Sequence, residues 1–207
     1  ATESGFSSNA NYFQLEGKNP DGTIDEFGRK LVDIDNLIDY MIIIFYTGNF
    51  DAPVTKFSGE NNPNNFYAIY NREENDGFIF LAHDNEHTLH VEEESPGIGL
   101  YEDRVNIDFN VYDFSKFHPQ WLHKKLSENL EYRIRFADRV YYHFYNEGVF
   151  QPETLTEIFM KSATDIELAI IAESAKWGDL TRSKYNAWEP AIDDIVNNFF
   201  PDRGDIV

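Results

Sequence analysis

The acidic and amide side chains between residues 48 and 89 are those whose types and spacing suggest chemistry. Asp51 directly follows an apolar helical segment, and a carboxylate positioned in this way can act as a general base toward a hydroxyl or water. The structural alternative is that Asp51 caps the turn that follows it, as aspartates in turns commonly do. Spacing alone leaves both interpretations open.

Asn65, Asp84 and Glu86 are candidate ligands of a divalent metal ion. Asn65 begins one predicted strand, Asp84 follows the end of the next, and Glu86 lies two residues further on. If the two strands pair, their ends meet at one edge, where amide and carboxylate oxygens would suit Mg²⁺ or Mn²⁺. The alternative is ordinary turn asparagines and an exposed acid at a strand end.

The same segment contains a rival motif, because His83, Glu86 and His87 spell HxxEH, a zinc-peptidase pattern. Zinc ligation by this pattern requires both histidines on one face of a helix. The preceding residues, FIFLA, favour a strand, so we expect His83 and His87 to point in unrelated directions. A zinc hydrolase is therefore the third functional interpretation of the chain, and for these histidines packing or bonds to carboxylates are favoured over zinc ligation.

A buried helix and a hairpin are predicted to position these side chains. Asp33 and Asp35 are candidate N-caps, and Gly48 suits the left-handed residue beyond a helix end. Apolar residues lie nearly all round the intervening segment, which predicts a central buried helix at residues 35–47. The segments NFYAIYN and FIFLAH flank a turn at residues 75–77 and predict a β-hairpin over residues 65–83.

The rest of the chain is polar at its start and mostly helical further on. Residues 1–28 predict an extended lead-in, with strand-like alternation at residues 11–17 and a turn at residues 19–23. Residues 90–118 lack periodicity and predict an irregular loop, in which a run of glutamates at residues 92–94 forms a solvated face. Further helices are predicted at residues 121–126, from Leu130 to near Gly148, from Pro152 to Trp177, and at residues 185–200, where Pro201 stops the last one.

Composition limits the class of partner. With 17 Lys and Arg against 37 Asp and Glu, the net charge of -20 opposes binding to nucleic acid or to an anionic bilayer without bridging cations. The longest apolar run, residues 41–46, is far shorter than the ~20 residues that span a bilayer, so no membrane insertion is expected. The 207 residues suit one domain or one large lobe, and the absence of cysteine excludes disulfides and thiolate chemistry.

In this order, GNFD, NNFYAIYN and HDNEHTL resemble the core of the CotH kinase family, secreted or spore-coat proteins with an atypical protein-kinase-like fold. The resemblance continues in FADRVYYHFYNEG, IAESAKWGD and NNFFPDR, and covers residues 31–207. It implies that Asp51 is the catalytic aspartate, that Asn65 binds metal and nucleotide, and that Asp84 is the principal Mg²⁺ ligand. Glu86 replaces the family's second aspartate, and His83 stands where the family usually has tryptophan.

The resemblance implies phosphoryl transfer from ATP to Ser or Thr hydroxyls of a protein, dependent on Mg²⁺ or Mn²⁺, outside the cell or on a cell or spore surface. The expected fold is α+β and mostly α, a protein-kinase-like C-terminal lobe over residues 33–207 whose small β-hairpin carries the acidic metal site. Residues 1–32 are then an extended lead-in and the remnant of an upstream lobe, because no phosphate-covering loop or Lys–Glu pair precedes Asp33. The alternative is a non-catalytic structural or adhesion module of the same fold.

Overall fold

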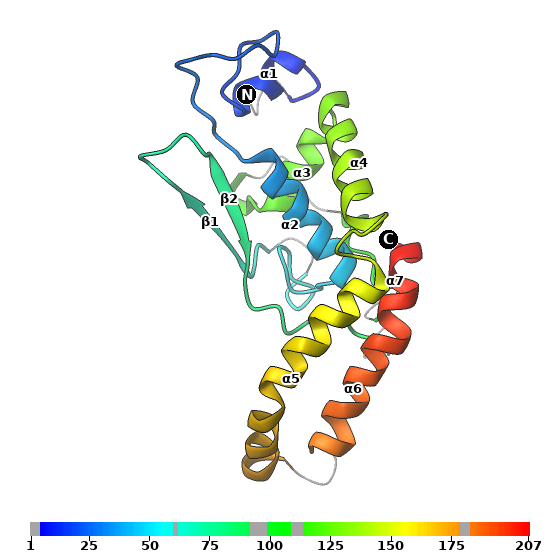
Figure 1. Ribbon diagram of the computed structural model, residues 1–207. Helices are drawn as coiled ribbons and strands as arrows, with labels where there is room; N and C mark the ends of the chain where they lie inside the picture. Colours follow the sequence, from blue (N-terminus) through cyan, green and yellow to red (C-terminus); the bar gives the residue numbers. More distant parts are fainter. Residues whose placement is uncertain (1–4, 60–61, 92–98, 109–113, 179–182) are drawn as a thin grey trace. The chain divides into compact units, whose positions relative to one another are not determined.

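The computed structural model describes residues 5–59, 62–91, 99–108, 114–178 and 183–207 of the chain. The glutamates at residues 92–94 lie outside the described residues. The chain divides into two compact units, the first formed by Ala1–Thr88 and Asp103–Tyr141, the second by Leu89–Glu102 and Tyr142–Val207 (Figure 1). All the candidate site residues belong to the first unit. The architecture is α+β and mostly helical, as predicted.

Helix α2 (Ile34–Thr47) is the central element of the first unit, and its prediction is confirmed. The Asp33 carboxylate caps it by accepting the backbone N–H of Asn36 at 3.0 Å. Gly48 ends it with a φ of 63°, which glycine adopts without steric cost. Ile43 is 42% exposed, so burial is not complete on every side. The buried side chains are Ile34, Leu37, Ile38, Tyr40, Met41, Ile42, Ile44, Phe45 and Tyr46.

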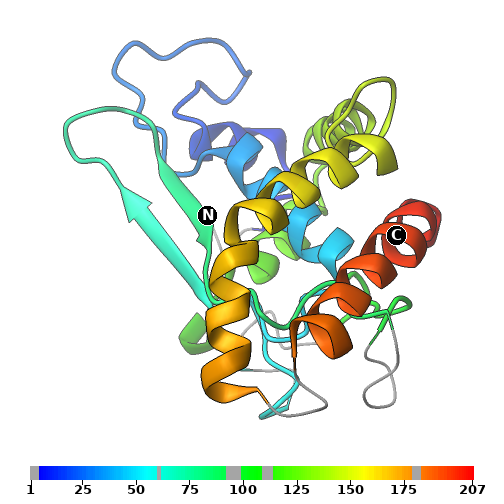
Figure 2. The same ribbon diagram turned by 60° about the horizontal axis from the view of Figure 1, so that its bottom comes forward.

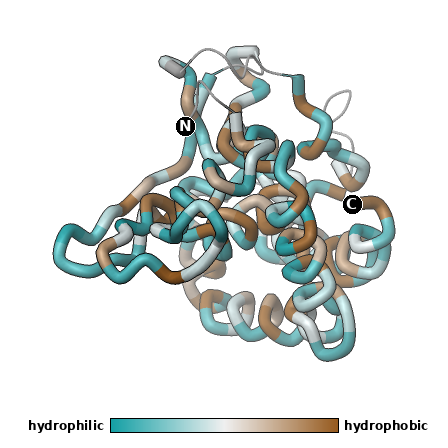
Figure 3. Tube along the Cα trace, turned by 90° about the horizontal axis from the view of Figure 1, so that it is seen from above, coloured by the Kyte–Doolittle hydropathy of each residue, from teal (hydrophilic) through white to brown (hydrophobic). Residues whose placement is uncertain are grey.

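The predicted hairpin consists of β1 (Phe66–Tyr70) and β2 (Phe78–Ala82), which pair antiparallel beside α2 (Figure 1). Asn36 joins α2 to β2, because its side chain bonds both the N–H and the C=O of Phe80, at 2.6 and 3.2 Å. Phe80 is itself buried. The connecting residues 71–77 project from the sheet (Figure 2), and the turns that project at the left of Figure 3 are mostly hydrophilic. The hairpin is therefore anchored on α2 through β2.

Residues 11–17 do not form the expected strand-like segment, because helix α1 (Asn9–Leu15) occupies most of them. Tyr12 and Leu15 are buried, and their spacing of three places them on one face of a helix. The spacing of apolar residues in this short segment is compatible with a strand or with a helix. Burial of the face that carries Tyr12 and Leu15 favours the helix. The turn predicted at residues 19–23 is confirmed by a 2.8 Å bond from the N–H of Gly22 to the C=O of Asn19.

Asn129 fastens α1 to the start of α4 (Leu130–Phe144). It is fully buried, and its Nδ2 donates to the C=O of Phe6 and to Oδ1 of Asn9, both at 3.0 Å. Its Oδ1 accepts the backbone N–H of Glu131 at 2.8 Å and that of Tyr132 at 3.3 Å. One amide thus caps a helix and holds the lead-in.

Asn129→Ala is therefore expected to lower the free energy of unfolding by about 2–3 kcal/mol, because a cap and buried hydrogen bonds are lost together. Urea unfolding of the parent and the variant measures this difference. Asn198→Ala is the matched control, since Asn198 is exposed and its amide donates to Oδ1 of Asp194 at 2.7 Å. A loss for Asn129→Ala no larger than the control's would contradict this role.

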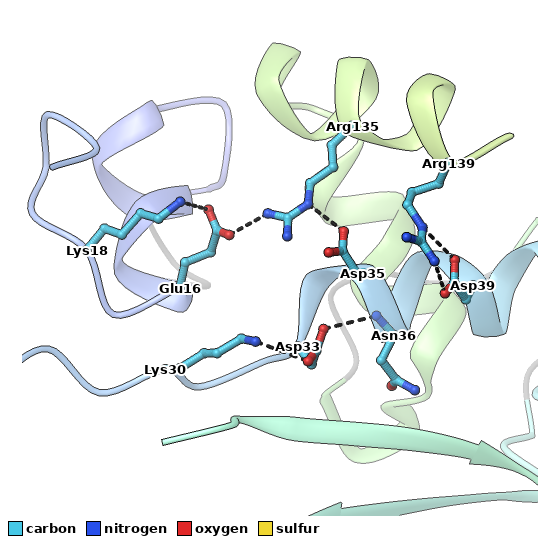
Figure 4. Close-up of polar contacts among 9 residues, drawn as sticks. All are labelled: Glu16, Lys18, Lys30, Asp33, Asp35, Asn36, Asp39, Arg135 and Arg139. Atoms are coloured by element: carbon cyan, nitrogen blue, oxygen red, sulfur yellow. Dashed lines mark hydrogen bonds and ion pairs between the residues drawn. The ribbon is translucent and has the colours of Figure 1, made fainter. Parts of the chain in front are cut away.

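Ion pairs fix α2 against α4 (Figure 4). Arg135 on α4 bonds Asp35 at 2.6 Å and also pairs with Glu16, at the end of α1. Arg139, one helical turn further on, holds Asp39 through both of its oxygens, with an Nε–Oδ1 distance of 2.8 Å. The hydrogen bond from Arg135 lowers the pKa of Asp35. These groups are partly exposed, so each pair contributes little free energy, but together they fix how α2 lies along α4.

Helix α3 (Pro119–Leu126) confirms the short helix predicted there, and a brief turn, η1 (Phe114–Lys116), precedes it. His118 caps α3, its Nδ1 accepting the N–H of Trp121 at 3.1 Å. Burial and, to a smaller extent, the nearby Arg104 together lower the pKa of His118 to about 4. Burial also lowers the pKa of His123 to about 4, and its Nδ1 lies 2.8 Å from the hydroxyl of Tyr132. Both histidines are therefore neutral at pH 7.

The free energy of unfolding is accordingly expected to fall on acidification below pH 6.5. The unfolded chain takes up a proton at each histidine near pH 6.5, whereas the folded chain takes it up only near pH 4. The contribution of these two histidines to the free energy of unfolding is thus constant above this pH window. Within the window it declines, by about 2 kcal/mol per histidine at about pH 5. Urea unfolding at several pH values measures the decline. His118→Asn, which keeps a capping oxygen but does not titrate, should remove about half of it, and an unchanged decline would contradict the assignment to His118.

In the second unit, α5 (Pro152–Trp177) is the predicted long helix with Pro152 in its first turn. It lies beside a last helical segment made of η2 (Lys184–Trp188), α6 (Glu189–Asp194), η3 (Ile195–Phe199) and α7 (Phe200–Ile206) (Figure 1). The prediction that Pro201 stops this segment is wrong, because α7 continues to Ile206. Among the helices of the described ranges, none combines the length and the apolarity that crossing a membrane demands.

Widened turns explain how prolines are tolerated in this segment. A proline ring clashes with the carbonyl four residues earlier and offers no N–H. Just before Pro201, η3 is a π-type turn in which the N–H of Phe200 bonds the C=O of Ile195. Pro190 follows η2, a second such turn, in the same way. The π-type turns place the change of geometry where each proline requires it, so the helix is not interrupted.

Candidate functional site

Asp51 is the buried acid of the turn that begins where α2 ends. Only 7% of it is exposed, and its Oδ2 accepts Nδ2 of Asn65 at 2.8 Å. Its Oδ1 is buried and has no hydrogen-bond partner among the described residues. Oδ1 of Asn49 accepts the N–H of Asp51 at 3.0 Å, and neither oxygen of the Asp51 carboxylate accepts a backbone N–H among the described residues, so Asp51 does not cap the turn that follows it. A buried carboxylate oxygen without a partner is costly, and a ligand or metal ion would satisfy it.

The open end of the hairpin brings Asn65 and Asp84 together next to Asp51. Asn65 precedes β1 and Asp84 lies just beyond β2, as predicted. Both have left-handed backbones, with φ of 49° and 54°, which asparagine and aspartate tolerate better than most residues. Nδ2 of Asn65 lies 3.4 Å from the backbone oxygen of Asp84 as well as bonding Asp51. Asn65 thus links the turn after α2 to the strand ends.

Glu86 lies apart from this cluster in its contacts. Its carboxylate is exposed and lies 3.5 Å from Nε2 of His87, with no hydrogen bond to Asp51, Asn65 or Asp84 among the described residues. Nowhere in the described ranges do three His, Cys, Asp or Glu side chains gather closely enough to hold a metal ion by themselves. The Asp84 carboxylate and the Asn65 amide oxygen are still donors of the kind that Mg²⁺ takes, because this ion usually binds one or two carboxylates and completes its shell with phosphate and water.

The HxxEH motif does not lie on a helix. Strand β2 ends at Ala82, and the His83 ring packs edge-on against Tyr67, with centroids 4.7 Å apart. His87 instead packs against Phe50 and Phe57, at centroid distances of 4.8 and 4.9 Å. The expectation that these histidines point in unrelated directions is confirmed, and both serve in aromatic packing.

Sequence reasoning missed the contribution of Asn49 and Asn85. Asn49 is fully buried, and its Nδ2 donates to Oδ1 of Asn85 at 2.9 Å. An asparagine two residues before Asp51 is the pattern of a turn in which the side chain accepts that residue's N–H. This signal could have identified Asn49, whereas its pairing with Asn85, 36 positions away, depends on the tertiary fold.

The first unit also contains a pocket of about 370 Å³, and its lining does not include Asp51, Asn65 or Asp84. It is lined by Val105, Asn106, Ile107, Asp108, Gln120, His123, Lys124 and Ser127. Asp108 is the only carboxylate in this lining, and none of the site residues predicted from the sequence belongs to it. The oxygen-rich cluster at Asp51 is therefore the better candidate for chemistry that involves phosphate and a metal ion.

Comparison with known proteins identifies the family. The family described as CotH kinase protein matches residues 10–207, nearly the whole chain, and the chain belongs to this family. No curated protein and no solved structure matches at a significant level. The match begins within α1, earlier than the resemblance at residues 31–207 had indicated, whereas the domain boundary at residue 33 stays a prediction. Membership suggests a kinase-related function in the transferase class.

Proposed function

We propose that this chain is a CotH-type protein kinase lobe that transfers the γ-phosphoryl group of ATP to Ser or Thr hydroxyls of a protein. The observation that carries the proposal is that Nδ2 of Asn65 joins the Asp51 carboxylate, at 2.8 Å, to the backbone oxygen of Asp84, at 3.4 Å, in one cluster. Phosphoryl transfer depends mainly on positioning and on neutralising charge, and such a cluster can serve both purposes. The resemblance to secreted and spore-coat kinases supports a place outside the cell or on a spore surface.

Each residue of the cluster has a role in this proposal. Asp84 presents an exposed carboxylate, and Asn65 has an amide oxygen that accepts no hydrogen bond among the described residues, so these two would hold Mg²⁺ or Mn²⁺. Glu86 would join them only after its side chain turned away from His87. The ion, when bound, neutralises the negative charge of the triphosphate.

Asp51 is suited to the acceptor hydroxyl rather than to the nucleotide. Its Oδ2 is held by Asn65, which fixes the plane of the carboxylate, and its Oδ1 remains free to accept the proton of a Ser or Thr hydroxyl. A base must lie within hydrogen-bond reach of the proton that it accepts. A carboxylate of fixed orientation needs less ordering to reach that geometry. The free oxygen of Asp51 thus gains a partner when the substrate binds.

The charge of the chain supports dependence on a metal ion. A net charge of -20 repels the uncomplexed triphosphate, and a divalent cation reduces that repulsion. The same charge opposes nucleic acid as a partner. ATP is therefore expected to bind only as its complex with Mg²⁺ or Mn²⁺.

The test is a transfer assay with γ-³²P-labelled ATP, Mg²⁺ or Mn²⁺, and casein as a probe acceptor, followed by mass spectrometry of the phosphorylated residues. The proposal predicts label on Ser or Thr of casein or of the chain itself, and no label when EDTA removes the metal ion. Absence of label with both ions from a folded chain would contradict the proposal and favour a non-catalytic structural or adhesion module.

A further inference from the structure

A single buried amide connects the two segments that supply the candidate site. Oδ1 of Asn49 accepts the N–H of Asp51, and Nδ2 of the same side chain donates to Asn85, the neighbour of Asp84. The two bonds measure 3.0 and 2.9 Å, and Asn49 is fully buried. The turn after α2 and the segment after β2 are therefore joined through one side chain.

The orientation of this amide is fixed by its partners. A backbone N–H can only donate, so the atom of Asn49 that faces Asp51 must be its oxygen. Its nitrogen then faces Asn85, which must present Oδ1 in turn. Rotation of the amide by half a turn would break both bonds at once. The bridge therefore has one arrangement and holds both segments in a fixed relation.

Aromatic packing reinforces the same connection. Phe50, between Asn49 and Asp51, lies 4.8 Å from the ring of His87 in the segment that carries Asp84. Phe57 contacts both rings, with its centroid 4.9 Å from that of His87 and 5.4 Å from that of Phe50. Residues 84–88 are thus held to the Asp51 turn by a polar bond at Asn85 and by an apolar contact at His87.

We propose that Asn49 is a positioning residue, which sets Asp84 relative to Asp51 so that the metal–nucleotide complex and the acceptor hydroxyl meet in line. This inference rests on the proposed function, and Asn49 itself is not expected to contact substrate. Displacement of reacting groups by about 1 Å can cost about 10²-fold in rate. A buried bridge of fixed orientation prevents such a displacement.

The test compares Asn49→Ala with Asn129→Ala, a matched control within the same chain. Asn129 is also fully buried, also accepts backbone N–H groups, and also donates to a second asparagine, Asn9. Two readouts are taken for each variant: hydrogen exchange of residues 84–88, and the Kd for Mg–ATP. Asn85→Asp, which keeps an acceptor for Asn49, should behave like the parent in exchange, whereas Asn85→Ala should behave like Asn49→Ala.

The proposal predicts that exchange at residues 84–88 rises about tenfold in Asn49→Ala, as expected when a hydrogen bond of about 1.4 kcal/mol is lost. It also predicts a Kd for Mg–ATP that is weaker by about tenfold or more in the same variant, with neither change in Asn129→Ala. Unchanged exchange or an unchanged Kd in Asn49→Ala would overturn it, as would equal effects in the control. If the parent chain binds no Mg–ATP, the proposed function fails instead, and the exchange measurement alone then decides whether Asn49 joins the two segments.

Discussion

Replacement of Asp51 by asparagine is expected to lower the rate of phosphoryl transfer by about 10²- to 10⁴-fold, the usual contribution of a positioned acid–base group. Asparagine keeps the shape of the side chain and can still accept the bond from Asn65, so the turn after α2 should not move. What is lost is the negative oxygen, Oδ1, that would accept the hydroxyl proton. Binding of Mg–ATP should change little, because Asp51 is directed to the acceptor.

The rate is measured with γ-³²P-labelled ATP at saturating nucleotide, and binding by calorimetry on the same preparations. Thermal unfolding serves as the control, and the variant should be at least as stable as the parent, because a buried carboxylate with an unpartnered oxygen is itself costly. Equal turnover by Asp51→Asn and the parent would remove Asp51 from the catalytic role. Loss of binding together with rate would instead place Asp51 at the nucleotide.

Replacement of Asp84 by alanine is expected to weaken Mg–ATP binding by about 10²-fold or more, because a charge-assisted ligand of the metal ion is lost. Asp84 is exposed and makes no side-chain hydrogen bond among the described residues, so its loss should leave the free energy of unfolding almost unchanged. Its left-handed backbone, with a φ of 54°, is the one source of cost, because alanine tolerates this region less well.

Calorimetric titration of Mg–ATP into the parent and into Asp84→Ala measures this effect. Asp76→Ala is the matched control, since Asp76 is an exposed acid in the connecting turn of the same hairpin. Glu86→Ala shows whether this third acid takes part, and the contact of its carboxylate with His87 predicts a smaller effect than for Asp84. Binding by Asp84→Ala equal to that of the parent would contradict the metal assignment.

The elements that position the site were predictable because their signals are local. A capping aspartate, an apolar run and a glycine define α2 between Asp33 and Gly48, and each end signal acts on backbone groups within about one turn of itself. The hairpin follows from two β-branched and aromatic segments around a turn. Because the strands pair in register, the prediction that Asn65 and Asp84 lie near each other followed from the same local pattern.

The features that were missed depend on contacts between distant segments. The residues of α1 alternate in a strand-like way in the sequence, and only the burial of Tyr12 and the bonds from Asn129 show why a helix forms there. Pro201 looked like a stop, because propensity does not include the π-type turn that accommodates it. The bridge from Asn49 to Asn85 joins positions that no sequence pattern pairs.

Mn²⁺, used as a paramagnetic probe, tests directly whether Asn65 and Asp84 hold the metal ion. In the presence of ATP, bound Mn²⁺ broadens the NMR signals of groups near it, and the side-chain amides of asparagines report several places on this chain of 24.1 kDa. We predict that the Asn65 amide and the backbone signals of Asp84 and Asn85 broaden first, while the Asn36 amide at the other end of α2 stays sharp. Broadening centred on the pocket lined by Asp108 and His123, or none at Asn65 and Asp84, would contradict the assignment of the metal ion to Asn65 and Asp84.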